Sequence, residues 1–204
     1  YSYGTWRDIT PPYEGTNWWL NGVHFSSASD GWAVGWDNAK DTGVLLHYTC
    51  SGGNILPVYR FWSPVYAHHF YTISEGDKDF IIATWPDIWT YEGPVFYASS
   101  TEACGSLPVY RFWSETFLGH FYTISEEEKN IVKATMQTDW TYEGPVYYAY
   151  PTQVPGTLPM YRFWSEVYLG HFYTISEADK DFVITTWPDI WNYEGPVFYA
   201  YPLD

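Results

Sequence analysis

The chain contains one block of sequence three times, and each copy starts 51 residues after the previous one. Leu56–Ser63 reads LPVYRFWS, and nearly the same residues return as Leu107–Ser114 and Leu158–Ser165. His69–Ser74 and Tyr91–Val95 return at the same spacing without any insertion. Self-similarity at a fixed period is the signature of a repeat architecture. The chain is therefore predicted to hold three like units, at residues 56–106, 107–157 and 158–204.

Each unit is expected to contain four short strands and one helix. In the first unit the strands are Val58–Trp62, His69–Ile73, Trp89–Glu92 and Val95–Ala98, which are rich in aromatic and β-branched residues. Ser74 followed by Asp77 is a capping-box pattern, which indicates a helix between the second and third strands. We expect Phe80, and Ile131 and Phe182 at the matching positions, to fix this helix against the sheet.

Three copies of such a unit predict an all-β fold, with a β-trefoil at residues 56–204. In a trefoil the copies close around a threefold axis, and closure removes the sheet edges that would otherwise pair with other chains. An open solenoid is the alternative, but it would need atypical repeats at its ends. The third unit closely resembles the other two, which favours closure.

The pattern Val-Tyr-Arg-Phe, His-Phe-Tyr-Thr-Ile-Ser, Trp-x-Tyr-Glu-Gly and Phe-Tyr-Ala, which recurs with small changes in all three units, resembles a tandem-repeat domain of secreted bacterial proteins. That domain often lies at the end of cell-wall or polysaccharide hydrolases, and its function is generally unassigned. The resemblance implies a lectin-like β-trefoil that serves as an accessory, non-catalytic module.

The turn between the first two strands of each unit departs from the family pattern, in which Asn, Gly or Asp are usual. Here the turns carry apolar residues, among them Val65, Tyr66, Phe117, Leu118, Tyr168 and Leu169. Apolar tips are costly to expose. We therefore expect them to fold back onto the sheet or to contact a partner.

Residues 1–55 do not belong to the repeats and read as three strands with tight turns. The stretches Trp18–Phe25, Ser29–Gly35 and Gly43–Tyr48 resemble one Gly-Trp-Ala-Val-Gly blade of a β-propeller. A propeller needs about four to eight blades, and a lone small sheet is marginal in water. The segment is expected to pack on the repeats, to belong to a longer propeller protein, or to pair with another subunit by strand addition, with Tyr3 and Trp6 as donor residues.

Acidic residues outnumber basic ones by 24 to 9, which gives a net charge of −15. Such a chain repels phosphate backbones and anionic lipid, so we expect no nucleic-acid partner, and no stretch reaches the roughly 20 apolar residues of a membrane span. Since the sequence starts at Tyr1, we expect a signal peptide to have been removed. Cys50 and Cys104 lie in Gly/Ser-rich connectors, where a disulfide in an extracellular setting is favoured over two free cytosolic thiols.

The sequence carries no enzyme signature, because nucleophile-elbow, P-loop and dinucleotide motifs are absent. We expect no cofactor and no metal. His69, His120 and His171 recur once per unit and would supply three ligands to a zinc ion on a threefold axis, but a structural role is favoured. Arg60 and Glu92 also recur in every unit, and equal copies favour ion pairs that hold the framework.

Aromatic residues make up 23% of the chain. Sugars stack on such rings while acids or amides bind their hydroxyls. The candidate carbohydrate-binding residues are Trp62, Trp113, Trp164, Trp85, Asp87, Trp187, Asp189, His69, His120 and His171. Unit two has Met136 and Thr138 where unit one has Trp85 and Asp87, so its site is expected to be weaker. Core packing of the repeated Trp residues is the alternative.

Two functions follow from these patterns. The first is a non-catalytic, extracellular, lectin-like module that binds glycans of a cell surface or wall through repeated aromatic sites. The second is a structural subunit of a secreted fibre or multimer, which would contact other copies of itself through the N-terminal sheet and the apolar tips.

Overall fold

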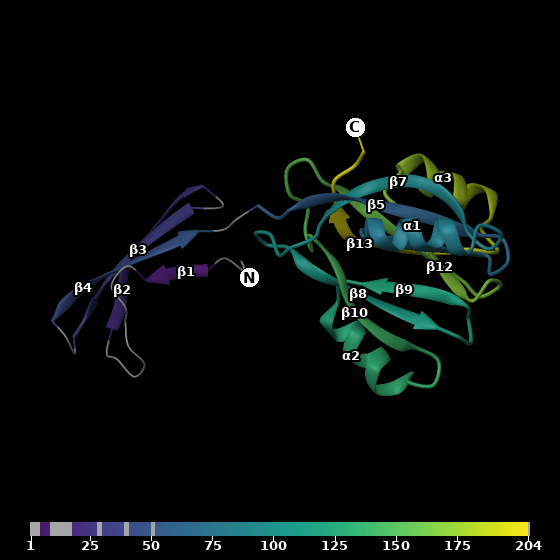
Figure 1. The fold of residues 1–204 in the computed structure, drawn as a ribbon. Coiled ribbons are helices and arrows are strands. Elements are labelled where there is room, and N and C mark those ends of the chain that lie inside the picture. The colour runs from purple at the N-terminus through teal and green to yellow at the C-terminus, as the bar shows by residue number, and fades with distance from the viewer. Residues whose placement is uncertain (1–4, 9–17, 28–29, 39–40, 50–51, 204) are drawn as a thin grey trace. The chain divides into compact units, whose positions relative to one another are not determined.

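The computed structural model describes residues 5–8, 18–27, 30–38, 41–49 and 52–203 (Figure 1). The chain divides into two compact units, which are treated separately. Tyr1–Gly53 and Ala103–Gly105 make up the N-terminal unit, and Asn54–Glu102 and Ser106–Asp204 make up the repeat unit.

The N-terminal unit is a four-stranded antiparallel sheet. Its strands are β1 (Thr5–Asp8), β2 (Trp18–Ser27), β3 (Asp30–Asp37) and β4 (Thr42–Thr49), in the order β1-β4-β3-β2. The last three are the strands that the sequence predicts, and β1 adds a fourth beside β4. Alternation along β3 and β4 buries Ala33, Val44 and Leu46 on one face. The sheet therefore has a small core of its own.

Each repeat contributes three antiparallel strands and one helix; the strands of the first two repeats join in one six-stranded sheet, and those of the third form a three-stranded sheet. The first repeat contains β5 (Ile55–Ser63), β6 (His68–Thr72), α1 (Glu75–Thr84) and β7 (Thr90–Ser99). The second contains β8 (Leu107–Ser114), β9 (Gly119–Thr123), α2 (Glu126–Thr135) and β10 (Thr141–Ala149). The third contains β11 (Leu158–Ser165), β12 (Gly170–Thr174), α3 (Glu177–Thr186) and β13 (Asn192–Ala200). In every repeat the first strand is central and pairs with the other two.

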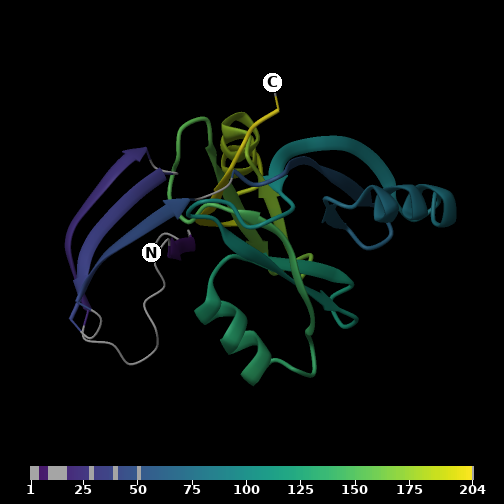
Figure 2. The same cartoon turned by 60° about the vertical axis from the view of Figure 1, so that its left-hand side comes forward.

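The three repeats close on one another. β7 pairs with β10 at Ser99 and Tyr148, and isolated bridges join Tyr97 to Tyr201 and Tyr150 to Tyr199. The first repeat thus contacts the third directly, which an open solenoid does not allow. Figure 2 shows the three helices on different sides of the strands. The structure is all-β with three like repeats around a pseudo-threefold axis.

The prediction of four strands per repeat is wrong, because the expected third and fourth strands form one continuous strand. In β7 the register against β5 shifts so that Tyr91 faces Phe61 while Gly93 faces Arg60, which leaves Glu92 as an extra residue in a bulge. Gly93 has a φ of 98°, a value that residues with a Cβ rarely adopt. With three strands per repeat, the structure supports the all-β class but does not confirm the trefoil.

A ring of three tyrosines joins the repeats at the centre. The hydroxyl of Tyr71 donates to the carbonyl oxygen of Tyr173 at 2.8 Å, that of Tyr122 to Tyr71 at 3.0 Å, and that of Tyr173 to Tyr122 at 2.9 Å. All three side chains are buried, and their rings meet edge to face. Burial raises the pKa of Tyr71 to about 12, so the hydroxyl keeps its proton. The cycle fixes how each repeat sits against the next two.

Both faces of each central strand carry buried residues. On one face Val58, Val109 and Met160 join the tyrosines in the main core. On the other face Tyr59 and Phe61 pack under α1 with Phe70 and Ile81. The helix covers what would otherwise be a second, solvent-exposed sheet face.

The helices begin where the sequence predicts. Ser74, Ser125 and Ser176 are N-caps, and each side chain accepts from the backbone N–H three residues later. The expected anchors are wrong, however, because Phe80, Ile131 and Phe182 are at least half exposed. Their neighbours Ile81, Val132 and Val183 are the buried residues of the helices. One helical step of about 100° separates the two positions.

One histidine fills the space at the axis where three equivalent residues meet. His68 is buried, and its matching residues are Gly119 and Gly170. A Cβ on Gly170 would lie 1.9 Å from Cε1 of His68, and one on Gly119 would lie 3.0 Å from the same ring. His68 Nε2 is 2.9 Å from the carbonyl oxygen of Phe117. The glycines are thus required by close approach of this imidazole.

Candidate functional site

Each repeat carries the same cluster of Arg, Glu and His side chains. In the first, Arg60 Nε donates to Glu92 Oε2 at 2.7 Å, and His69 Nε2 lies 3.5 Å from that oxygen. The same two distances recur for Arg111, Glu143 and His120, and for Arg162, Glu194 and His171. The bulge that displaces Glu92 from the strand register lies beside Arg60. The predicted pairing of the repeated Arg and Glu is confirmed.

The three repeated histidines are neutral. Burial, assisted by the charge of the neighbouring Arg, lowers the pKa of His69, His120 and His171 to about 3. Each ring lies against the Trp of its own hairpin, as for His120 and Trp113 with ring centroids 4.8 Å apart. Nδ1 of His120 and of His171 is buried without a hydrogen-bond partner among the described residues. In the part of the chain that the structure describes, no three His, Cys, Asp or Glu residues gather to hold a metal ion.

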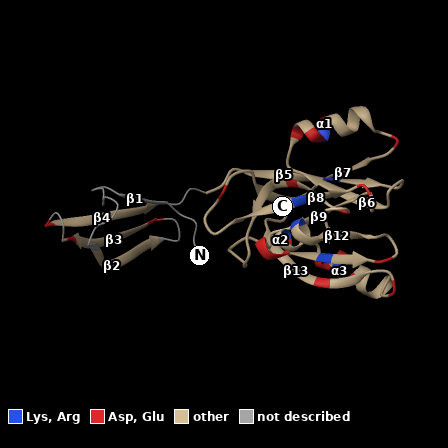
Figure 3. Cartoon of the chain, turned by 90° about the horizontal axis from the view of Figure 1, so that it is seen from below, with Lys and Arg blue, Asp and Glu red and all other residues tan. Residues whose placement is uncertain are grey.

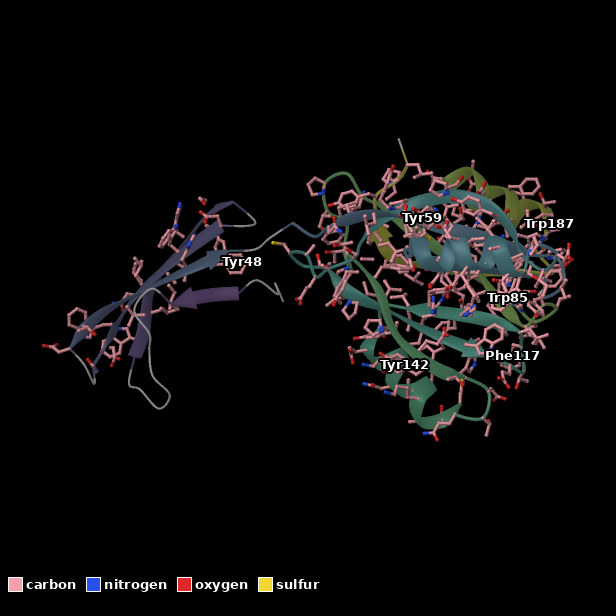
Figure 4. All side chains as sticks on the ribbon, in the orientation of Figure 1. Tyr48, Tyr59, Trp85, Phe117, Tyr142 and Trp187 are labelled. Carbon is pink, nitrogen blue, oxygen red and sulfur yellow. The ribbon has the colours of Figure 1, made fainter. Side chains whose placement is uncertain are left out.

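A pocket of about 550 Å³ lies between the first and second repeats. The first repeat supplies mostly aromatic and apolar side chains from α1, its C-terminal turn and β6, and the second supplies one Trp with three polar side chains. The walls include Phe70, Phe80, Trp85 and Trp89, and the second repeat adds Trp113, Arg111, His120 and Glu143. Trp85 is the C-cap of α1 and is 43% exposed, so its ring is open to a ligand (Figure 4). Phe80 meets it edge to face at 5.2 Å.

A second pocket, of about 470 Å³, lies between the third and first repeats and uses matching positions. Trp187, Trp191 and Phe172 take the places of Trp85, Trp89 and Phe70, and the first repeat adds Trp62, His69 and Glu92. Arg60 and Asp179 do not line this pocket but line a separate cavity of about 220 Å³. The same combination of Trp rings, a carboxylate and a neutral His is therefore presented twice.

The interface between the second and third repeats differs from these two. Arg162 donates from Nη1 and Nη2 to the two carboxylate oxygens of Glu128, both at 3.0 Å. Asp77 and Asp179 stand at the position of Glu128 in the other repeats, and each instead accepts from a Thr hydroxyl of its own repeat. Met136 also replaces the exposed Trp of the other two helix ends.

The aromatic residues of the hairpin turns fold back onto a Trp of their own repeat, which is one of the two expected arrangements of the tips. Tyr66 lies against Trp89, Phe117 against Trp140 and Tyr168 against Trp191, with ring centroids 5.6–5.8 Å apart. The tip residues Val65, Leu118 and Leu169 remain exposed, as does Tyr168 in part.

The structure brings six of the ten carbohydrate-binding candidates to the two pockets. These six are Trp62, His69, Trp85, Trp113, His120 and Trp187. Asp87 and Asp189 are exposed and line neither pocket, and Trp164 and His171 belong to the third interface. The sequence predicts a framework role for the repeated Arg and Glu and gives no sign that Asp77 lines a pocket, whereas the structure places Arg111, Glu143 and Asp77 in the first pocket. The recurrence of these residues every 51 positions indicated that they matter in each repeat. Only the closed arrangement of the repeats shows which residues of neighbouring repeats meet.

Charged residues are sparse, and on the ribbon of the repeat unit the Lys and Arg positions lie near Asp and Glu positions (Figure 3). Beside the first pocket, the single positive charge of Arg111 faces the carboxylates of Glu143 and Asp77. The pocket therefore carries a net negative charge within an aromatic wall.

Several candidates of the N-terminal unit fall outside what is described. Tyr3 and Cys50 lie outside the described residues, and of Trp6 only the backbone is described, paired with Tyr48. The Cys50–Cys104 disulfide therefore stays a prediction. On β3, Trp32, Val34 and Trp36 are exposed on one face, and Trp32 stacks on His47 with centroids 3.9 Å apart.

Fold and pockets define an all-β repeat protein with aromatic pockets between sheet-and-helix units. No helix among the described residues has the length and apolar character needed to cross a membrane. A family described as a domain of unknown function (DUF5648) matches residues 26–135 and 120–201, and the chain belongs to this family. No curated protein matches the chain, and no solved structure does.

Proposed function

We propose that the chain is a non-catalytic, extracellular module that binds carbohydrate of a cell surface or wall in the pockets between its repeats. The observation that carries this proposal is the double occurrence of one site: exposed Trp, partly buried Trp, carboxylate and neutral His. Flat aromatic walls suit the C–H faces of a sugar ring, and carboxylate oxygens suit its hydroxyls.

The two pockets support binding to a repeating polymer. Single contacts of this kind are weak, but two sites on one chain raise the effective concentration of a polymeric ligand at the second site. The lectin-like character implied by the family resemblance is part of this proposal, as is the extracellular location, which the predicted disulfide and the acidic composition support.

A glycan array with the full chain tests this function. We expect retention on one class of polysaccharide, and we expect Trp85→Ala or Trp187→Ala to weaken it several-fold, since an aromatic stacking contact contributes about 0.5–1.5 kcal/mol. Met136→Ala is the matched control at the third helix end and should leave retention unchanged. An array without signal, or equal effects of all three variants, would refute the proposal.

The alternative is a structural subunit that assembles with copies of itself. The observation in its favour is the exposed apolar face of the N-terminal unit, formed by Trp19, Trp32, Val34, Trp36 and Leu45. Apolar patches of this kind mark interaction surfaces in soluble proteins. Size-exclusion chromatography and negative-stain imaging test it: polymers that Trp36→Ser disperses would support assembly, and a monodisperse monomer would refute it.

A further inference from the structure

The position of Glu128 distinguishes one of the three interfaces between repeats. Its carboxylate accepts two parallel hydrogen bonds from Arg162. Such bidentate pairs are among the strongest hydrogen-bonded contacts between Arg and a carboxylate. At the interface between repeats one and two, the equivalent Arg111 bonds Glu143 through Nε alone among the described residues. Arg162 uses its two Nη atoms to bind Glu128. The two Nη atoms of Arg111 have no such carboxylate partner among the described residues.

A difference of one methylene group explains why the interfaces diverge. Asp77 is shorter than Glu128, and its Oδ2 accepts from the hydroxyl of Thr72 at 2.9 Å. Asp179 does the same with Thr174 at 3.0 Å. No bond between Thr123 and Glu128 is found among the described residues, because Glu128 reaches across the interface instead. A Glu at this position bridges the repeats, whereas an Asp stays within its own repeat.

We infer that Glu128 acts as a built-in ligand that closes the interface between repeats two and three, so that the chain binds a neutral sugar at two interfaces instead of three. The number of sugar sites rests on the proposed function; the closure itself does not. In the first pocket the Nη edge of Arg111 takes two neighbouring oxygens of the ligand, in the place that the Glu128 oxygens occupy at the closed interface, whereas Arg60 lies outside the lining of the second pocket.

The charge of the first pocket defines the kind of sugar. Asp77 and Glu143 already outweigh Arg111, and the whole chain carries −15, so a uronate or other acidic sugar is repelled. Two adjacent hydroxyls of a neutral sugar offer acceptor oxygens to Arg111 and donor protons to the carboxylates. The pocket therefore fits an uncharged hexose or N-acetylhexosamine unit.

Arginine labelling tests the closure without any sugar. Phenylglyoxal reacts with the Nη edge of Arg, and peptide mapping reads each Arg separately in the folded, full-length chain. We expect Arg111 to react several-fold faster than Arg162. Glu128→Asp should expose Arg162, and Asp77→Glu should protect Arg111, while Glu127→Asp makes the same chemical change at an exposed neighbouring residue and should alter nothing. Equal labelling of the two Arg residues in the unmodified chain, or no response to the two exchanges, would overturn the closure.

Binding stoichiometry tests the number of sites. Native mass spectrometry with neutral hexasaccharides of glucose, of mannose and of N-acetylglucosamine, and with a hexamer of galacturonate, gives the number bound per chain. We expect at most two neutral sugars on the unmodified chain, one on Asp77→Glu, none on Asp77→Glu/Asp179→Glu, and three on Glu128→Asp/Met136→Trp. Three bound sugars on the unmodified chain, or preference for galacturonate, would overturn the inference. If no sugar binds while the labelling pattern holds, the proposed function fails and the closure stands.

Discussion

The two units of the chain use aromatic residues in opposite ways. In the repeat unit, Phe61, Phe112 and Phe163 are fully buried at matching positions between sheet and helix. In the N-terminal unit, Trp19, Trp32 and Trp36 are exposed, Tyr48 is the buried aromatic residue among those described, and the clustered core consists of Ala33, Val44 and Leu46. A helix over the outer face and two neighbouring repeats give each sheet of the repeat unit two covered faces. The single sheet of the N-terminal unit has only one. Acid, which protonates the buried histidines, and truncation of a core ring are therefore expected to act on the repeat unit, whereas substitutions on the exposed face of the N-terminal sheet should have little effect.

Acid should have the largest effect, and it should act on the repeat unit. His69, His120 and His171 have a folded-state pKa of about 3 against about 6.5 when unfolded, so below pH 6.5 the unfolded state binds more protons. Stability is therefore fully present above pH 6.5 and is lost as the pH falls towards 3. Each His contributes about 1.4 kcal/mol per pH unit, so the three together cost of the order of 6 kcal/mol at pH 5.

Hydrogen exchange read by mass spectrometry reports the two units separately. Protection of β8 and β11 should fall sharply between pH 7 and pH 5 once intrinsic exchange rates are corrected for. The variant His69→Asn/His120→Asn/His171→Asn should flatten this dependence. If the protection of the repeat unit did not change between pH 7 and pH 5, the histidines could not be buried in the neutral form.

Truncation of a core aromatic ring should have the next largest effect. Phe112→Ala removes a fully buried side chain, and we expect the free energy of unfolding to fall by about 3–5 kcal/mol in urea titrations. Phe80→Ala removes the same ring at a half-exposed position of the same unit and is the control. Similar losses for the two variants would show that the helices do not cover the sheets as described.

Removal of one hydroxyl from the tyrosine ring should have an intermediate effect. Tyr122→Phe leaves the carbonyl oxygen of Tyr71 and the backbone N–H of Tyr71 without their partner. Because both are buried, we expect a loss of about 1–3 kcal/mol in the same urea titration. Tyr142→Phe, whose ring is only partly buried, serves as the matched change outside the ring of three. If Tyr122→Phe left the free energy of unfolding unchanged, this result would argue against the hydrogen-bonded cycle of tyrosines.

The smallest effect is expected for the exposed face of the N-terminal sheet. Trp36→Ser should change the free energy of unfolding by less than about 0.5 kcal/mol, as is usual for exposed positions. Calorimetry of the full chain checks this. A loss comparable to that of Phe112→Ala would mean that this face is covered in solution, which would favour the assembly alternative.

Local chemistry made part of the fold predictable from the sequence. The spacing of 51 residues located the repeats, and Ser74 with its two counterparts located the helix starts. The strand count was misjudged at Gly93-Pro94, which reads as a break between strands but forms a bulge within one. The choice between Phe80 and Ile81 as helix anchor also failed, because adjacent apolar residues give no decisive periodicity.

The pockets were less predictable than the fold. The sequence predicts Trp85 and Trp187 as site residues of the first and third repeats, but their partners Trp113 and Trp62 come from the next repeat around the ring. A repeat read in isolation shows which residues recur and gives no information about which copies meet. The side chain of Glu128 is one methylene group longer than that of Asp77. Whether this length lets it reach an Arg of the next repeat depends on the distance across the interface, which the sequence does not give.

The single imidazole at the axis limits how far the three copies can be made alike. A chain assembled from three copies of the first repeat would bring three histidine rings into a volume that holds one, and it would clash. Three copies of the second repeat would place glycine at all three positions and leave a void of ring size. An ancestor with three identical copies could not have been well packed at this position on the axis. A design that makes the three repeats identical must therefore keep one His and two Gly residues there.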